Sequence, residues 1–229
     1  MGAEIAIKDL TKTYVKPGTD FKSVPVLQGL DLTVSAGESL AVLGVSGAGK
    51  STLIHILGAL DRPTSGAVLF DGVDVFQWDE NRMARFRNRS IGFIFQFFNL
   101  LPEFTSLENT MMPALLLGMS RREAKERAQI ILNEVGLGDR MTHKPGELSG
   151  GEQQRAAVAR ALMMEPEILL ADEPTGNLDR STGIKIEDML VNLNQTKSVT
   201  LIVVTHNKSL ADRMSRRIGL GDGRIYTIA

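Results

Sequence analysis

The 229-residue chain carries 26 lysines and arginines against 27 aspartates and glutamates, and it contains no cysteine. This nearly balanced charge provides no overall attraction to nucleic acid, so no nucleic-acid partner is expected. The lack of cysteine excludes a disulfide framework and a thiolate-bound metal. A chain of this length fits one large α/β domain, or a core with a smaller lobe.

The sequence also lacks the features of an exported or membrane-spanning chain. Its first nine residues do not combine a basic start with a long apolar core, as a signal peptide would. The longest apolar candidate, residues 111–119, is too short to span a membrane and contains a proline and a glycine. We therefore expect a soluble protein, most simply a cytoplasmic one.

Two stretches near the N-terminus, residues 4–10 and 26–34, alternate apolar and polar side chains and predict strands. A loop containing Pro17, Gly18 and Pro25 is expected between them. These strands predict a small, mainly antiparallel sheet that leads into the segment described below.

Tyr14 comes just before this loop. Its aromatic face could stack on a nucleotide base, because every purine offers a π-face. Judged alone, however, a tyrosine at this place is more often a half-buried strand residue.

Residues 44–51, Gly-Val-Ser-Gly-Ala-Gly-Lys-Ser, match the phosphate-binding pattern G-x-x-x-x-G-K-[ST]. The apolar residues 39–43 before it predict a strand, and those of 52–57 after it recur at helical spacing. The glycines allow backbone N–H groups to face one concavity, to which the helix N-terminus adds a favourable partial charge. Lys50 can bind the β- and γ-phosphates, and the Ser51 hydroxyl can bind Mg²⁺. An ordinary glycine-rich turn is the alternative, but the flanking strand and helix favour a nucleoside triphosphate site.

The next segment predicts a turn at 63–66, a short strand at 67–70 and a second turn at 71–72. Residues 79–89 follow with four arginines, at positions 82, 85, 87 and 89. Such a run is most often a solvated helix face, and we interpret it in this way.

An unusually apolar region begins with residues 91–95, which predict a buried strand ending at Gln96. Five of the nine phenylalanines fall between Phe93 and Phe104. Composition alone leaves open whether this stretch belongs to the core or forms a docking surface for a partner.

Two helices are predicted at 106–117 and 120–135. Ser120 and Glu123 have the spacing of a capping box, and Gly136 supplies a stop signal. This helical insertion is expected to form a second lobe beside the nucleotide-binding sheet.

A further helix opens at residues 148–154, Leu-Ser-Gly-Gly-Glu-Gln-Gln, and is expected to run to about Met164. Ser149 and Glu152 again have capping-box spacing, which would suffice as an explanation. Two glycines, however, cost roughly 1 kcal/mol each in a helix relative to alanine, and they leave first-turn N–H groups open to an anion. A second phosphate-contacting helix start is therefore plausible.

The strand predicted at 167–171 is nearly all apolar, as in a parallel sheet that is covered on both faces. It ends in Asp172 and Glu173, at the edge where ligands bind in open α/β sheets. Asp172 can belong to the Mg²⁺ shell, and Glu173 can polarise a water molecule. The alternative of two solvated acids in a turn is weakened by the apolar run before them.

A helix at about 181–194 and a buried strand at 199–204 follow, and the strand ends at Thr205 and His206. A lone histidine is usually structural, but at this sheet edge it can position a γ-phosphate. The chain closes with a short helix predicted at about 208–214 and two edge strands predicted at 217–221 and 224–228.

Together these segments resemble the ATP-binding cassette of ABC transporters, over essentially the whole chain. The Walker A motif corresponds to residues 44–51, the Walker B motif to 168–173 and the signature to 148–153. The Q-loop corresponds to Gln96, the D-loop to 177–179 and the switch histidine to His206. The Walker pair alone would indicate only a P-loop NTPase, whereas the signature with the other motifs in order is highly specific. Tyr14 falls on the aromatic position that stacks adenine in the family.

The resemblance implies a P-loop NTPase fold of the α/β class. It would have a mainly parallel core sheet, an N-terminal antiparallel β lobe and an inserted α-helical subdomain. The chain would then be a single ABC ATP-binding domain, residues 1–229. Core and β lobe would occupy about 1–95 and 160–229, and the helical subdomain about 97–160.

The resemblance also implies ATP and Mg²⁺ as cofactors and a head-to-tail homodimer that holds ATP between its subunits. The residues that would bind ATP within one chain are Tyr14, Gly44, Val45, Ser46, Gly47, Ala48, Gly49, Lys50, Ser51 and Thr52. Those acting on the ATP of the second copy would be Ser149, Gly150, Gly151 and Glu152. Mg²⁺ would be bound by Ser51, Gln96 and Asp172, with Glu173 as general base, His206 holding the γ-phosphate and Gln96 linking the metal to a membrane subunit.

Within the family, residues 95–101 and 107–110 look most like the lipoprotein-releasing and macrolide-export branch. The greatest likeness is to the ATPase subunits that drive lipoprotein release from the inner membrane of Gram-negative bacteria. This implies a peripheral position on the cytoplasmic face of the inner membrane. Integral membrane permease subunits would dock near Gln96–Phe104, so we prefer a partner surface for that stretch.

Two alternative functions share this cassette pattern: an ATPase of a macrolide or efflux exporter, and an ATP-driven signalling regulator of the cell-division type. A soluble DNA-repair or translation ATPase is disfavoured, because the chain has neither a coiled-coil insertion nor a second cassette. Position 207 is asparagine where many relatives carry aspartate, and either residue can cap the following helix.

Overall fold

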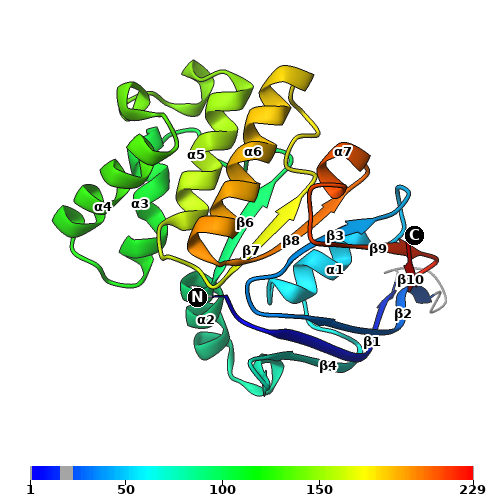
Figure 1. Cartoon of the computed structure of the whole chain (residues 1–229). Coiled ribbons are helices and arrows are strands. Elements are labelled where there is room, and N and C mark those ends of the chain that lie inside the picture. The colour runs from blue at the N-terminus through cyan, green and yellow to red at the C-terminus, as the bar shows by residue number, and fades with distance from the viewer. Residues whose placement is uncertain (1, 16–22, 229) are drawn as a thin grey trace.

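The computed structural model describes residues 2–15 and 23–228, and its strands form two sheets (Figure 1). The larger sheet contains, in spatial order, β10 (Arg224–Thr227), β9 (Arg216–Gly221), β3 (Ser39–Leu43), β8 (Thr200–Thr205), β7 (Ile168–Asp172) and β6 (Ile91–Phe95). The smaller sheet contains β2 (Ser23–Val34), β1 (Ile5–Val15), β4 (Ser65–Phe70) and β5 (Val73–Asp74), paired antiparallel throughout.

The helices are α1 (Lys50–Leu57), α2 (Glu80–Ser90), α3 (Ser106–Leu116), α4 (Arg121–Glu134), α5 (Gly150–Leu162), α6 (Arg180–Lys197) and α7 (Lys208–Ala211). Short 3-10 turns lie at Val75–Gln77, Gly138–Arg140 and Pro145–Glu147. Helices α3, α4 and α5 gather at one end of the molecule, whereas α1 lies between the two sheets (Figure 1). In the two described ranges, none of the helices has both the length and the apolar character needed to cross a membrane.

The larger sheet is parallel from β9 to β6, and only β10 runs antiparallel to its neighbour. Its register pairs Leu43 with Thr205 and Phe95 with Asp172. The carboxyl ends of β3, β6, β7 and β8 therefore meet at one edge, which is where α/β sheets bind ligands. Most of the functional residues predicted from the sequence lie in the segments that follow these four strands.

Helix α1 is the centre of the core between the sheets. Leu53, Ile54, Ile56 and Leu57 are all fully buried, so the helix is apolar around most of its circumference. A helix of this kind must be covered on several sides, and here strands of both sheets contribute to the same apolar cluster. This packing fixes the start of α1, and with it the phosphate-binding loop, relative to the sheet edge.

A second apolar cluster covers the other face of the larger sheet. It is built from residues of α3 to α7 packed on β6, β7 and β8, and it extends without a break into the three-helix group. Capping boxes at Thr105–Glu108 and Ser120–Glu123 define the starts of α3 and α4. The predicted helices at 106–117 and 120–135 are thus confirmed to within a residue or two.

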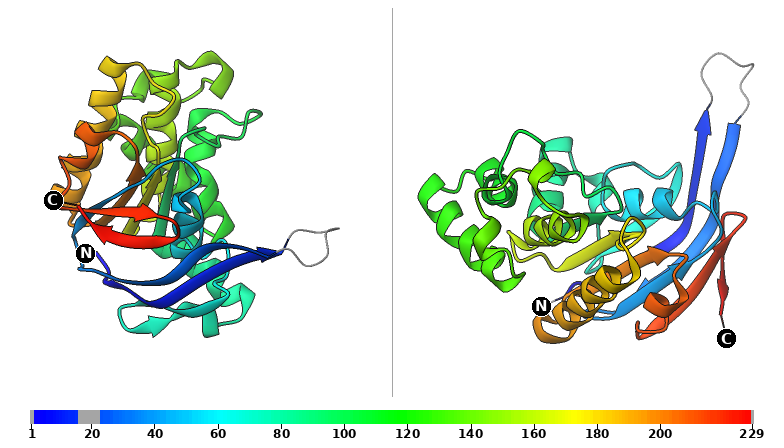
Figure 2. Two further views of the ribbon diagram at one scale, coloured as in Figure 1. Left: turned by 90° about the vertical axis from the view of Figure 1, so that its right-hand side faces the viewer. Right: turned by 90° about the horizontal axis from the view of Figure 1, so that it is seen from above.

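The two long strands of the smaller sheet extend beyond their predicted limits of 4–10 and 26–34 (Figure 2). Strand β1 passes through irregular pairing near Asp9, which has a positive φ of 44°, and then continues to pair with β2. Pro25 was expected in a loop but lies in β2, an edge strand in which a missing N–H is tolerated. Pro17 and Gly18 lie outside the described residues.

Smaller differences occur elsewhere. Strand β4 begins two residues earlier than expected, and β5 was not predicted because it is only two residues long. The helix expected at 208–214 is the short α7. Strands β9 and β10 were both expected at an edge, but β9 lies between β10 and β3, so of these two only β10 is an edge strand.

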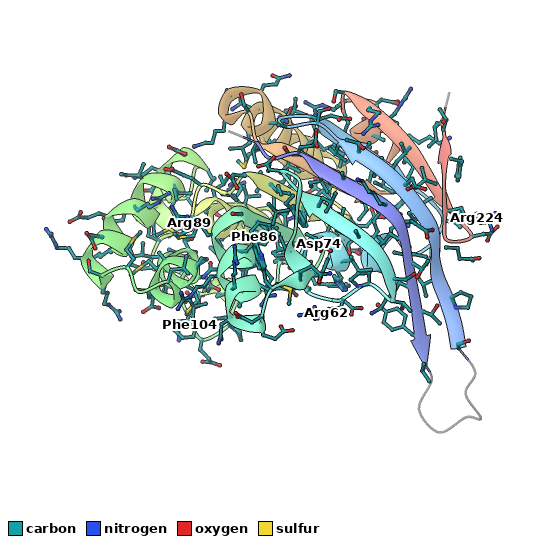
Figure 3. All side chains as sticks on the ribbon, turned by 90° about the horizontal axis from the view of Figure 1, so that it is seen from below. Arg62, Asp74, Phe86, Arg89, Phe104 and Arg224 are labelled. Atoms are coloured by element: carbon teal, nitrogen blue, oxygen red, sulfur yellow. The ribbon has the colours of Figure 1, made fainter. Side chains whose placement is uncertain are left out.

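Helix α2 packs on the smaller sheet through Phe86, whose ring lies against those of Phe70 and Trp78, with ring centroids 5.0 and 5.7 Å apart (Figure 3). The arginines of α2 face outward, as predicted, with one exception. Arg82, Arg85 and Arg89 are exposed. Arg87, by contrast, is half-buried and donates to the carbonyl oxygen of Ala59 at 2.6 Å.

Candidate active site

The phosphate-binding loop joins β3 to α1 and takes its shape from glycines. Gly49 directly precedes α1 with a φ of 98°, a left-handed conformation that other residues rarely adopt. A Cβ atom on Gly44 would lie 2.3 Å from the carbonyl oxygen of Leu220, so only glycine fits there. The Lys50 ammonium lies over the loop and donates to the carbonyl oxygens of Gly44 and Val45, at 2.8 and 3.1 Å. A cation and a helix N-terminus thus converge on one concavity.

This loop forms one wall of a cavity of about 680 Å³. The predicted residues that line it come from the ends of four parallel strands, namely Gly44, Val45, Ser46, Gly47, Gly49, Lys50, Ser51, Thr52, Gln96, Asp172, Glu173 and His206. Val26, Phe95, Phe97 and Asn99 also line it and were not predicted as site residues. Segments far apart in the sequence therefore meet around one cavity, as expected for residues that follow the strands of one parallel sheet.

Asp172 ends β7 beside the start of α1. Burial raises the pKa of its carboxyl, a hydrogen bond from Ser51 lowers it, and the charge of Glu173 raises it further, with a net upward shift. A cation at this position would relieve both the desolvation and the repulsion. Within residues 2–15 and 23–228 no group of three or more histidines, cysteines or acids forms a metal site. One carboxylate with one hydroxyl fits Mg²⁺, which takes few protein ligands and uses substrate phosphates and water for the others.

Glu173 and His206 are in direct contact. The Glu173 Oε1 atom lies 2.9 Å from Nδ1 of His206, and Oε2 accepts hydrogen bonds from the Thr205 hydroxyl at 3.0 Å and the His206 backbone at 3.3 Å. The backbone of Glu173 has a positive φ of 46°, which is uncommon for a residue with a side chain. Its N–H is bonded to the carbonyl of Val204 at 2.9 Å. Hydrogen bonds therefore fix the orientation of the Glu173 carboxylate. The backbone of this residue has an uncommon conformation of the kind found at functional sites.

Gln96 is bonded to the segment that follows β7. Its Nε2 donates to Oδ1 of Asn177 at 3.1 Å, and Nδ2 of Asn177 donates to the Gln96 carbonyl at 2.9 Å. These two bonds join the predicted Q-loop to the predicted D-loop. Any movement of one segment must therefore displace the other or break both bonds.

The signature segment starts α5 with a complete capping box. The Ser149 hydroxyl accepts from the Glu152 backbone, and the Glu152 carboxylate accepts from the Ser149 backbone at 2.8 Å. These bonds, with help from Arg140, lower the pKa of Glu152 to about 2. The N-terminal part of α5 is also tied to the segment that follows β7, because the buried Gln154 donates to the Pro174 carbonyl at 2.7 Å.

Three groups of predicted residues do not line this cavity. Ser149, Gly150, Gly151 and Glu152 lie outside it, and Ala48 is buried beneath the loop. Tyr14 also lies outside the lining, close enough to Thr52 for a side-chain hydrogen bond. The Tyr14 hydroxyl donates to Asp61 at 2.7 Å, and the residue is 40% exposed. The tyrosine therefore lies beside the first turn of α1, with part of its surface accessible.

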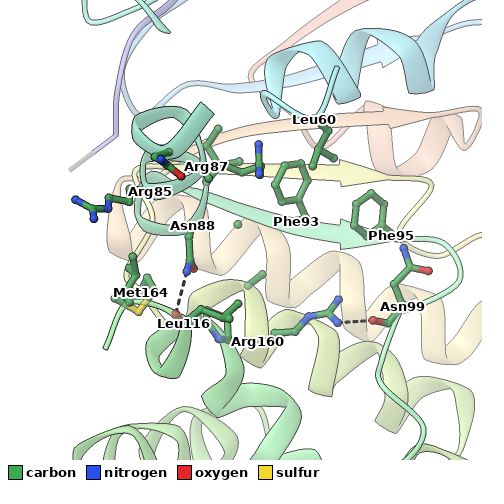
Figure 4. Close-up of a pocket in the computed structure, with 17 residues that line it drawn as sticks. Leu60, Arg85, Arg87, Asn88, Phe93, Phe95, Asn99, Leu116, Arg160 and Met164 are labelled. Carbon is green, nitrogen blue, oxygen red and sulfur yellow. Dashed lines mark hydrogen bonds between the residues drawn. The ribbon is translucent and has the colours of Figure 1, made fainter. Parts of the chain in front are cut away.

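A second cavity, of about 620 Å³, lies between α2, β6, α3 and α5 (Figure 4). Phe93 and Phe95 are stacked on one of its walls, with ring centroids 5.6 Å apart. Arg160 of α5 donates to the carbonyl oxygens of Phe98 and Asn99, the former at 2.9 Å. The phenylalanine-rich stretch is thus divided between a cavity wall and a loop fastened to the signature helix.

Comparisons with known proteins agree with this arrangement. The ABC transporter family model matches residues 27–176. The chain therefore belongs to the ABC transporter family and is an ATP-binding cassette that hydrolyses ATP. Its family, its fold class and its activity were correctly predicted from the sequence.

Relatives within the family match nearly the full length of the chain. The chain is 69% identical over 225 residues to the lipoprotein-releasing system ATP-binding protein LolD of Syntrophus aciditrophicus, covering 98% of this chain and 100% of that protein. The protein of the same description from Geobacter metallireducens is 55% identical, covering 98% of this chain and 99% of that one.

Two solved structures of the cassette MJ0796 share the fold with TM-scores of 0.88. One is a dimer of this bacterial ABC transporter cassette, 41% identical, with 96% of each chain covered. The other is a dimer in a post-hydrolysis state bound to ADP and Pi, 39% identical, covering 98% of this chain and 99% of that one.

Proposed function

We propose that the chain is the ATPase subunit of an ABC transporter that releases lipoproteins from the inner membrane, acting at the cytoplasmic face of that membrane. The observation that carries the enzymatic part is the single cavity that brings together the phosphate loop, Asp172, Glu173 and His206. The cargo is inferred from the relatives, which are described as lipoprotein-releasing system ATP-binding proteins and match nearly the whole chain.

ATP binds with its phosphates over the loop of residues 44–51, where Lys50 exchanges its carbonyl partners for phosphate oxygens. Tyr14 stacks on the adenine, because its partly exposed ring lies beside the first turn of α1. Ser51, Asp172 and Gln96 are the residues that hold Mg²⁺. When bound, the metal neutralises charge on the phosphates.

Glu173 acts as the general base that takes a proton from the attacking water. His206 contacts the same carboxylate and contributes an exposed ring to the lining of the cavity, from which it holds the γ-phosphate. Because Glu173 accepts hydrogen bonds from Thr205 and from the backbone and ring of His206, its orientation is set before the reaction, which lowers the cost of reorganisation.

The signature residues complete the site of a second copy of the chain. Ser149, Gly150, Gly151 and Glu152 begin a helix whose N-terminus suits a phosphate, and they do not line the cavity of their own chain. The solved structures similar to this chain are dimers, which supports the pairing of two copies. We infer that the two copies pair head to tail. In such a dimer each ATP lies between one phosphate loop and the other signature helix.

Membrane subunits dock at the surface that includes Gln96–Phe104. Phe97 is 73% exposed, and Leu101 and Phe104 are exposed as well. Asn99 of the same stretch lines the cavity between α2 and α5. Arg160 fastens this loop to the signature helix, so a force on the loop reaches the ATP of the second copy. We divide the chain into core and β lobe, about 1–95 and 160–229, and a helical subdomain, about 97–160, which carries this surface.

The experiment uses the Glu173→Gln variant, tagged and trapped with ATP in its native membranes. ATP binding should persist while turnover falls by about a hundredfold or more, because a general base is lost. Membrane subunits carrying lipoprotein should be recovered with the variant. A drug-efflux assembly or a cell-division partner in their place would overturn the proposed cargo, and near-normal turnover would remove Glu173 from the role of base.

A further inference from the structure

Asn207, the residue after His206, forms hydrogen bonds through both ends of its side chain. Its Oδ1 accepts from the Leu210 backbone at 3.3 Å and caps α7, in agreement with the capping role expected from the sequence. Its Nδ2 donates to Oε1 of Glu187 at 2.9 Å. One end of the amide faces a backbone donor and the other a carboxylate, so its orientation is fixed.

Glu187 lies on α6 and is only 3% exposed. A buried carboxylate requires hydrogen-bond donors, and Asn207 supplies the short one. The nearest cation is Arg213, whose Nη1 is 3.6 Å away and whose Nη2 is bonded to Asp188 at 2.6 Å. Arg213 is therefore shared between two acids, and Asn207 is the closer partner of Glu187.

Two further contacts connect Asn207 to the hydrolysis site. The Asn207 backbone N–H donates to the Thr205 hydroxyl at 3.0 Å, and that hydroxyl donates to Oε2 of Glu173 at 3.0 Å. Thr205 is fully buried, so water does not replace these partners. A buried acid on α6 is thus linked through residues 205–207 to the Glu173–His206 pair.

We propose that Glu187 is a positioning residue for ATP hydrolysis, which holds residues 205–207 in place through Asn207 and thereby orients Glu173 and His206. The inference rests on the proposed roles of Glu173 and His206. It predicts that positions 187 and 207 must match: one side chain has to donate to the other. An aspartate at position 207 would still cap α7, but it would place a second carboxylate against buried Glu187.

The test compares Asn207→Asp, Glu187→Gln and the double variant in the full-length chain, with Asp188→Asn as a matched control. Asp188 lies next to Glu187 on α6 and is bonded to the same arginine, but its side chain has no bond to Asn207. In Asn207→Asp the kcat should fall by about tenfold or more, because a buried acid loses its donor and gains a like charge. The Kd for ATP should change by less than about twofold, since the phosphate loop is untouched.

The double variant Glu187→Gln/Asn207→Asp separates positioning from capping. Its introduced amide on α6 can donate to the introduced carboxylate before α7, which restores the bond with the two roles reversed. The kcat should therefore return to within about threefold of the wild type. The control Asp188→Asn should turn over normally. A pure capping role predicts instead that Asn207→Asp has unchanged kcat and unchanged thermal stability.

Normal kcat in Asn207→Asp would overturn the inference, as would a double variant no more active than Asn207→Asp. If Asn207→Asp alone does not fold, the double variant decides in the same way: recovered folding and turnover support the pairing, and failure of both contradicts it. Near-normal turnover in Glu173→Gln would instead refute the proposed base itself. Failure of the inference and failure of the proposed function are therefore distinguishable.

Discussion

Asp61 joins the smaller sheet to the segment after α1, and we expect Asp61→Asn to weaken both folding and base binding. Its Oδ1 accepts from Nζ of Lys12 at 2.7 Å, and its Oδ2 accepts from the Tyr14 hydroxyl at 2.7 Å. The Lys12 ammonium also donates to the Arg62 carbonyl at 2.7 Å and lies 4.7 Å from the centre of the Tyr14 ring. One carboxylate thus holds both the cation and the aromatic ring in place.

The magnitude of the effect follows from the burial of these groups. Lys12 is only 9% exposed, so in Asp61→Asn its charge retains a single backbone acceptor and a neutral amide. Hydrogen bonds to charged groups contribute about 1.5–3 kcal/mol, and the partial exposure of Asp61 reduces this to about 1–2 kcal/mol of unfolding free energy. The melting temperature should fall by about 2–8 °C for a chain of this size.

Glu80→Gln provides the matched control. Glu80 forms a 2.7 Å ion pair with Arg62, which follows Asp61 in the sequence, but both side chains of this pair are exposed. Removing the pair should cost less than about 1 kcal/mol. The loss of unfolding free energy in each variant is measured by urea unfolding. Equal losses would show that the burial of Lys12 does not strengthen its bond to Asp61, and would contradict this prediction.

The same Asp61→Asn variant should affect the binding of ATP more than the binding of its phosphates alone. A loosened Tyr14 ring loses part of its stacking, so the Kd for ATP should rise by about 2- to 10-fold. The Kd for tripolyphosphate should remain unchanged, since Lys50 and the loop are not altered. A parallel rise for both ligands would show general damage to the site and contradict the reasoning.

The stability difference should also depend on pH. Burial raises the pKa of Asp61, but the bonds from Lys12 and Tyr14 outweigh it and leave the pKa below its ordinary value. Because the pKa of Asp61 is lower in the folded state, the stabilisation that this carboxylate provides is complete above its unfolded-state pKa of about 4. The stabilisation is lost as the pH falls through the lower, folded-state pKa. The gap between wild type and Asp61→Asn should therefore be constant near neutrality and narrow below about pH 4.

Two further predictions concern the loop and the signature helix. Gly44→Ala should weaken ATP binding by about a hundredfold, because the added Cβ would lie 2.3 Å from the Leu220 carbonyl oxygen and displace the loop. Isothermal titration calorimetry measures this affinity, and an unchanged Kd would contradict the reasoning from the loop geometry. Ser149→Ala should lose about 1 kcal/mol through the missing cap. It should also raise the pKa of Glu152 above about 2, because the hydroxyl bond to the carboxylate is lost, although the backbone bond of residue 149, the larger cause, remains. An NMR titration that finds no rise would refute the contribution of the hydroxyl.

Much of the fold followed from local patterns. The phosphate loop was predictable because its strand, glycines and helix are contiguous, and β3 and α1 begin and end close to the expected residues. The convergence of Gln96, Asp172, Glu173 and His206 followed from placing each after a strand of one parallel sheet. The ends of β1 and β2 were missed, because pairing between strands carries each one past its own apolar alternation.

The contacts missed from the sequence are those between polar residues far apart in the chain. Lys12 and Asp61 are separated by 49 positions, and Glu187 and Asn207 by 20, with no repeated spacing to connect them. Asn207 was predicted as a helix cap, which is a local role. Its second bond depends on the packing of α6 against the end of β8, which only the folded chain reveals.

The most direct test of the account is the association state of Glu173→Gln with ATP, measured by sedimentation and compared with Glu173→Gln/Gly150→Asp. An acid at the first position of α5 is favourable for the helix but repels a γ-phosphate. The added Cβ would lie 3.3 Å from the flexible side chain of Leu178 and 3.9 Å from the Phe98 ring, which is an ordinary contact distance. The account predicts that Glu173→Gln forms a dimer with ATP, whereas the double variant binds ATP with normal affinity and remains a monomer. Equal dimerisation of both variants would contradict a site completed by the signature helix of the second copy.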